Sequence, residues 1–158
     1  MVKVKAKGQT LSKKNILDNC YSIVRNKMEL LRNQINELIV DAESDSKSSA
    51  GDKHETARAM MQLEQEKLNR QLAELIKQEE VLNQIRFDES HDRIQLGSVI
   101  QTDRGNIFLS IPLGKMNLDQ SDYMVISPVS PFGKTILGLS DGTSFEVNNT
   151  KYQVLKIY

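Results

Sequence analysis

The sequence has few of the residues that cross-link chains, break helices or bind transition metals. It contains one cysteine, three prolines and no tryptophan in 158 residues. A single cysteine, Cys20, excludes an internal disulfide, and its place among helically spaced apolar residues predicts a buried thiol. The two histidines, His54 and His91, have no cysteine or histidine at ligand spacing, so we expect no zinc site.

The chain also lacks net charge and long apolar runs. It has 21 basic and 21 acidic residues, so its overall field gives no reason to expect tight, nonspecific binding to nucleic acid. No apolar run approaches the ~20 residues of a membrane span, and the first 14 residues lack the apolar core of a signal peptide. We therefore expect a cytoplasmic protein without a membrane partner. The five lysines of this segment, with Arg25, Lys27 and Arg32, form either a surface for RNA or a solvated basic tail.

Two long helices are predicted in the first half of the chain, which contains no proline. Apolar residues recur at three-and-four spacing from Leu11 to about Ala42 and again from Thr56 to about Ile85. The polar stretch Ser44–Gly51 between them has the composition of an exposed turn. Long helices joined by a short loop fold back as an antiparallel pair. Residues 1–88 are thus predicted to form a coiled-coil hairpin that projects as a rod.

Residues 89–158 are predicted to form a second, β-rich domain, which gives an α+β protein. After the polar linker 87–92 the apolar pattern changes from helical to strand-like spacing. Candidate strands are Ile94–Gln101, Asn106–Ile111, Tyr123–Ile126, Thr143–Val147 and Tyr152–Ile157. One short helix, Phe132–Leu137, is expected, with Ser130 as its N-cap and Pro131 at its first position.

Two acids three residues apart, Asp52 and Glu55, mark the loop end of the predicted hairpin. One interpretation is a capping box, in which they stabilise the second helix by about 1 kcal/mol. The other is a pair of carboxylates that helps to hold a divalent metal inside another molecule. Two carboxylates bind Mg²⁺ poorly alone, because the ion keeps its waters and needs several oxygen ligands, so a second molecule would have to complete the site.

The sequence resembles the Gre family of bacterial transcription elongation factors over nearly its whole length, and three segments carry the resemblance. Gly51–Ala57 is similar to the family's tip, Gly-Asp-Leu-Ser-Glu-Asn-Ala-Glu-Tyr, and matches its Gly, Asp, Glu and Ala in register. Ile94–Ser98 resembles the start of the family's C-terminal domain. Ile126–Lys134, with Leu137 and Gly138, resembles its Ser-Pro-x-Gly-Lys-x-Leu-x-Gly segment. Motifs in the same order and at the same spacing are more specific than any one alone.

The resemblance implies a transcript cleavage factor with an FKBP-like C-terminal domain. Such a factor binds RNA polymerase, inserts its hairpin into the secondary channel and stimulates Mg²⁺-dependent cleavage of backtracked RNA near the 3′ end. Asp52 and Glu55 would help to hold the shared Mg²⁺, and Ser130 and Pro131 would contact the polymerase. The protein would bind no cofactor alone and would not itself be an enzyme, since the catalytic centre is the polymerase's. We expect a monomer.

The sequence departs from the family pattern at three positions. Lys53 replaces an apolar residue between the two acids, His54 replaces a serine, and Val129 stands where some members carry an acid. These changes leave open a noncleaving regulator that occupies the same channel. A general coiled-coil interaction protein is a third possibility, in which Asp52 and Glu55 act only as a cap.

Overall fold

The computed structural model describes residues 2–6, 9–46 and 52–158, and the side chains of residues 2–5, 12–44 and 54–158. The elements follow the order β1 (Lys3–Ala6), β2 (Gln9–Ser12), α1 (Lys13–Ser46), α2 (Asp52–Asn83), β3 (Val99–Thr102), β4 (Gly105–Leu109), β5 (Gly114–Leu118), β6 (Ser121–Ile126), α3 (Pro131–Ile136), β7 (Ser144–Val147) and β8 (Thr150–Ile157). The α+β class is confirmed. Of the predicted turn Ser44–Gly51, residues 44–46 are helical, and residues 47–51 lie outside the described part.

The chain divides into two compact units. One is Ser22–Glu79, which is helical, and the other combines Met1–Tyr21 with Glu80–Tyr158. The second unit therefore contains the strands together with the first turns of α1 and the last turn of α2. The predicted boundary between residues 88 and 89 follows the chain order, whereas the compact units divide within the two long helices.

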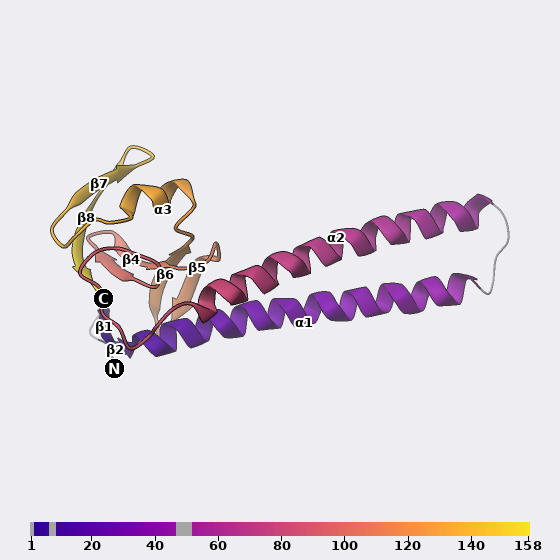
Figure 1. The fold of residues 1–158 in the computed structure, drawn as a ribbon, viewed down its shortest axis with the longest axis horizontal. Coiled ribbons are helices and arrows are strands. Elements are labelled where there is room, and N and C mark those ends of the chain that lie inside the picture. Colours follow the sequence, from indigo (N-terminus) through magenta and orange to yellow (C-terminus); the bar gives the residue numbers. More distant parts are fainter. Residues whose placement is uncertain (1, 7–8, 47–51) are drawn as a thin grey trace. The chain divides into compact units, whose positions relative to one another are not determined.

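Helices α1 and α2 form the predicted antiparallel hairpin (Figure 1). They have 34 and 32 residues. Buried and half-buried positions alternate at spacings of three and four, which is the pattern of a coiled-coil seam. These positions are Val24, Met28, Leu31, Ile35, Leu38 and Ala42 in α1, and Met61, Gln65, Leu68, Leu72 and Leu75 in α2. Across the seam, Arg25 Nε lies 2.9 Å from Glu79 Oε2.

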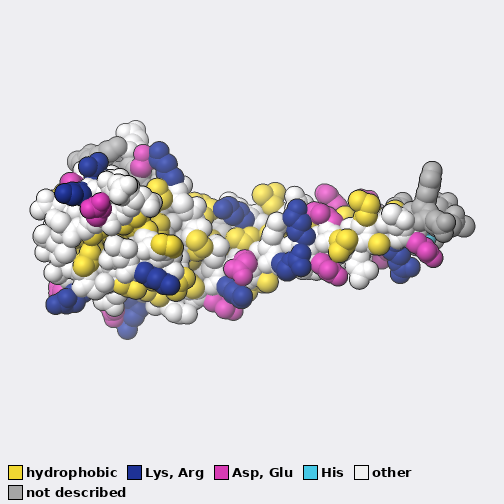
Figure 2. Space-filling view, turned by 90° about the horizontal axis from the view of Figure 1, so that it is seen from above, with side chains coloured by type: hydrophobic (Ala, Val, Ile, Leu, Met, Phe, Trp, Pro, Cys, Tyr) yellow, Lys and Arg dark blue, Asp and Glu magenta, His cyan; other side chains and the backbone are white. Residues whose placement is uncertain are grey.

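The outer surface of the hairpin mixes both signs of charge with exposed apolar side chains. Figure 2 shows Lys and Arg interspersed with Asp and Glu along it. Leu30, Val40, Met60 and Leu63 are each more than three-fifths exposed. Neither α1 nor α2, nor any other helix in the described ranges, has a stretch long and apolar enough to cross a membrane.

The β-rich part is a six-stranded sheet with the order β5-β6-β4-β3-β8-β7. Strands β4 and β6 pair in parallel, and the other neighbours are antiparallel. One face carries a core that includes Ile100, Ile107, Leu109, Val154 and Ile157 together with Ile136 of α3. Helix α3 thus covers part of this face.

The predicted strand Ile94–Gln101 was too long at its start. Ile94 is buried, but β3 begins only at Val99, because Gly97 has a φ of +88° and turns the chain. Strand β5 and the hairpin β1–β2 were missed, since their sequences GKMNL, KVKA and QTLS contain few β-branched residues.

The first turns of α1 bury both an expected and an unexpected side chain. Cys20 is buried, as predicted, with Sγ 3.7 Å from Sδ of Met116, and burial raises the pKa of its thiol to about 12. The expectation that all five amino-terminal lysines lie on a solvated or RNA-facing surface was wrong for Lys13. Its side chain is fully buried, and Nζ donates to the carbonyl oxygens of Glu89 (3.0 Å) and Tyr158 (3.3 Å). Burial lowers the pKa of Lys13 to about 8, against the raising effect of Glu89.

Candidate functional site

The hairpin's loop end carries the two acids that the sequence singled out. Asp52 is the first residue of α2, and Glu55 lies in the same turn. Residues three apart in a helix are neighbours on one face, so the backbone brings these two positions together. The Glu55 side chain is exposed. The Asp52 side chain lies outside the described side chains, and Gly51 of the same motif lies outside the described residues.

Further acids lie on the last turns of α1. Asp41 and Glu43 are exposed, and the Asp45 side chain is outside the described set. Among the side chains that the structure describes, no three His, Cys, Asp or Glu residues come together as a possible metal site. Described carboxylates from this chain therefore supply at most part of a coordination shell.

The second predicted site, Ser130–Pro131, is the N-terminus of α3. Ser130 is the N-cap, as predicted: its Oγ accepts a hydrogen bond from the Gly133 amide at 3.0 Å. The same hydroxyl donates to the Ser127 carbonyl oxygen at 2.7 Å. Pro131 is the first helical residue, also as predicted, and is exposed. The cap therefore has its geometry fixed by the protein itself.

Exposed apolar side chains lie at both ends of α3. Val129, immediately before the Ser130 cap, is 76% exposed, and Leu137, just after the last residue of α3, is 43% exposed. Such exposure contributes nothing to the core, so these side chains are available to a partner. The sequence identified Val129 only as a departure from the family pattern and did not predict the exposure of Val129 and Leu137.

An apolar cavity of about 430 Å³ lies beside α3 and was also missed. Its lining includes Phe132 and Tyr152. Tyr152 stacks on Phe145, with ring centroids 5.0 Å apart, and Phe132 meets both rings edge-on. Arg104 lies 5.9 Å from the Tyr152 ring centroid. The sequence does concentrate its aromatic residues after position 86. Which of them come into contact, however, depends on the pairing of β7 with β8, which places Phe145 opposite Tyr152.

Comparisons with known proteins give a distant structural likeness. No protein-family model matches the sequence. No curated protein matches it either. Among solved structures, that of the transcription factor Gfh1 is similar at 20% identity, covering 87% of this chain and 92% of the other, with a TM-score of 0.34.

Proposed function

We propose that the chain is a Gre-type transcription factor that binds bacterial RNA polymerase and stimulates Mg²⁺-dependent cleavage of backtracked RNA. The observation that carries the proposal is the position of Asp52 and Glu55 in the first turn of α2, at the loop end of a long antiparallel hairpin. A capping role explains why acids are favoured there, but it does not require an exposed Glu55.

The donor set suits a shared metal rather than one held by this chain alone. Mg²⁺ takes oxygen ligands in octahedral geometry and is usually held by one or two carboxylates plus other groups. Asp52 and Glu55 would supply such carboxylates, and the polymerase would supply the rest. When bound, Mg²⁺ lowers the pKa of a coordinated water and stabilises charge on the leaving oxygen. On this proposal the chain is no free-standing enzyme, holds no cofactor alone, and acts as a cytoplasmic monomer.

The β-rich part would dock on the polymerase through the α3 cap. Ser130 and Pro131 present a fixed turn, and the exposed side chain of Val129 precedes it. A preformed apolar turn loses little conformational entropy on binding, which favours a stable contact. Val129 cannot form an ion pair, so the partner surface facing it should be apolar.

Lys53 favours a second candidate, a noncleaving regulator of the same channel. It lies in the same helical turn as both acids, and a cation at that position opposes the capture of a second positive ion. The two candidates differ in one outcome: the regulator binds polymerase and changes pausing or initiation without shortening RNA.

Binding and cleavage should be measured side by side. Labelled RNA in a backtracked polymerase complex is incubated with Mg²⁺ and either the wild-type chain or a variant. We expect wild-type protein to shorten the RNA, Asp52→Asn/Glu55→Gln to bind without shortening it, and Glu64→Gln, an exposed acid further along α2, to behave as wild type. Binding without cleavage by the wild-type chain would support the regulator. No binding at all would support a general coiled-coil interaction protein.

A further inference from the structure

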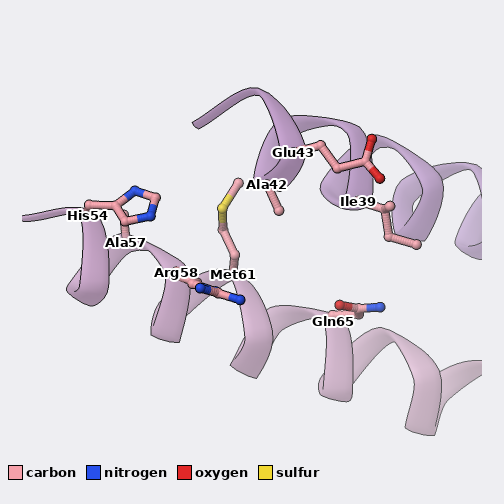
Figure 3. Close-up of a pocket in the computed structure, with 8 residues that line it drawn as sticks. All are labelled: Ile39, Ala42, Glu43, His54, Ala57, Arg58, Met61 and Gln65. Carbon is pink, nitrogen blue, oxygen red and sulfur yellow. The ribbon is translucent and has the colours of Figure 1, made fainter. Parts of the chain in front are cut away.

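The seam of the hairpin contains a cavity near its loop end. It has a volume of about 300 Å³ and lies between the last turns of α1 and the first turns of α2 (Figure 3). This is within the size range of small-molecule sites in proteins. The cavity belongs entirely to the helical unit Ser22–Glu79.

Two alanines explain why the cavity exists. Elsewhere the seam is filled by Val, Met, Leu and Ile, but Ala42 and Ala57 line it here. A coiled coil is closed by side chains that reach into holes on the facing helix, and a methyl group is too short to do so. The gap is therefore encoded in the sequence, although the three-and-four pattern continues through Ala42 and Met61.

The chemistry of the lining is unusual for a hole in a hydrophobic seam. His54, Arg58 and Gln65 carry flat groups with hydrogen-bonding edges, Met61 adds a polarisable thioether, and Glu43 adds a carboxylate. Figure 3 shows Met61 reaching from α2 toward Ala42 of α1, with His54 and Gln65 at opposite ends of the cavity. A simple packing defect tends to be lined by aliphatic groups and to stay dry. A ligand here would be flat, partly apolar and polar at its edges.

A nucleobase has these properties. Proteins that bind single-stranded RNA stack bases on His, aromatic and Arg planes and hydrogen-bond their edges with polar side chains. A metal ion fits less well, because the described residues do not bring three metal-ligating side chains together. A wholly apolar ligand would leave the polar groups of His54, Arg58 and Gln65 facing it without partners.

We propose that this cavity holds a base at the extruded 3′ end of the RNA in the backtracked polymerase complex. The inference rests on the proposed function, since the hairpin meets RNA only in that complex. His54 lines the cavity and lies in the first turn of α2 with Asp52 and Glu55, so the cavity is within about one helical turn of the two acid positions. The base site then positions the RNA, while Asp52 and Glu55 act on the metal.

Photo-crosslinking tests this directly, with 4-thiouridine at the 3′ end of the RNA in a backtracked complex. We expect a crosslink that maps to residues 54–65. Ala57→Leu, which adds side-chain volume at an exposed position of the cavity lining, should reduce its yield by about 10-fold, the effect of losing one stacked base. Ala59→Leu adds the same side chain at an exposed position outside the lining and should keep the wild-type yield. Helix content and melting temperature confirm that both variants fold.

The outcomes separate this inference from the cleavage proposal. Asp52→Asn/Glu55→Gln should lose cleavage and keep the crosslink. A crosslink sensitive to Ala57→Leu in a wild-type complex that never shortens RNA would overturn cleavage and support the base site. Cleavage with no crosslink, or with equal crosslinks for Ala57→Leu and Ala59→Leu, would overturn the base site alone. If the wild-type chain does not bind polymerase, both proposals fail.

Discussion

Gly133 of α3 packs directly against the backbone of Ser127. A Cβ atom at position 133 would overlap the Ser127 carbonyl oxygen and would lie 2.9 Å from Cα of Pro128. The same carbonyl accepts hydrogen bonds from the amide of Ser130 (3.1 Å) and from its hydroxyl (2.7 Å). The close approach at Gly133 is thus part of the cap that presents Ser130 and Pro131.

Gly133→Ala should therefore destabilise the protein, although alanine is the better helix former. The added methyl group must displace backbone atoms, and overpacking of this kind costs about 1–3 kcal/mol. Denaturant unfolding measures the change. Lys134→Ala, at the next and exposed position of α3, is the matched control and should stay near the wild-type free energy of unfolding. Equal stability of Gly133→Ala and wild type would contradict the packing described here.

Val129→Asp should weaken binding to polymerase without changing stability. The side chain is 76% exposed, so replacing it costs no core packing. It would, however, place a charge in a contact that we propose to be apolar. Ser130→Ala provides the contrast, since it removes the N-cap and should also reduce the free energy of unfolding by about 1 kcal/mol. Titration with labelled polymerase and a parallel denaturation curve give both quantities, and undiminished affinity of Val129→Asp would remove Val129 from the docking surface.

The tight turn between β5 and β6 offers a stabilising substitution. Asp119 and Gln120 both have positive φ, at 47° and 65°, a region that costs a residue with a Cβ roughly 1 kcal/mol. Gln120→Gly should thus raise the free energy of unfolding by about that amount. Gly142→Ala is the reverse test: φ there is +79°, and no atom lies within 4 Å of an added Cβ, so its cost is conformational alone. A loss of stability in Gln120→Gly would show that its side chain makes a stabilising contact.

The lowered pKa of Lys13 predicts that the free energy of unfolding depends on pH, with a definite sign. Its pKa falls from 10.5 to about 8 on folding, so between these values the unfolded chain binds more protons than the folded chain. Its contribution to stability should therefore rise as the pH increases from about 8 to 10.5, by on the order of 2 kcal/mol. Burial raises the thiol pKa of Cys20 to about 12, so its contribution to stability should fall as the pH rises above about 9.

The difference between wild type and Lys13→Met isolates the lysine from Cys20 and from other groups that titrate at alkaline pH. Unfolding free energies of both proteins are compared at pH 7.5 and at about pH 10. The free energy of unfolding of the wild-type protein should rise relative to that of Lys13→Met between these two pH values. A constant difference would mean that the pKa of Lys13 is not lowered in the folded protein.

The hairpin and the α3 cap could be predicted from the sequence because their signals are local. Apolar spacing gives α1 and α2 without knowledge of their partners, and Ser130-Pro131 is a self-contained helix start. Strand β5 and the burial of Lys13 could not be predicted in this way. β5 owes its conformation to pairing with β6, and Lys13 is buried only because Glu89 and Tyr158, 76 and 145 residues away, bring carbonyl oxygens to its amine.

The candidate site was predictable in its residue types but not in its surroundings. The pair Asp52 and Glu55 stands out by spacing and by resemblance, and the helix places both in one turn. The cavity beside them depends on which residues of α1 face Ala57, which requires the register of the hairpin. The exposure of Val129 and Leu137 at the two ends of α3 likewise depends on the folded domain.

The initial rate at which backtracked RNA is shortened, at saturating protein and fixed Mg²⁺, tests whether Asp52 and Glu55 act in cleavage. We expect the wild-type chain to accelerate shortening over polymerase alone and Asp52→Asn/Glu55→Gln to reduce that acceleration by about 100-fold, the scale of losing a stabilising group at a reacting centre. Glu64→Gln should retain the wild-type rate. Equal rates for the wild-type chain and the Asp52→Asn/Glu55→Gln variant, with both shown to be bound, would contradict a role for these acids in cleavage.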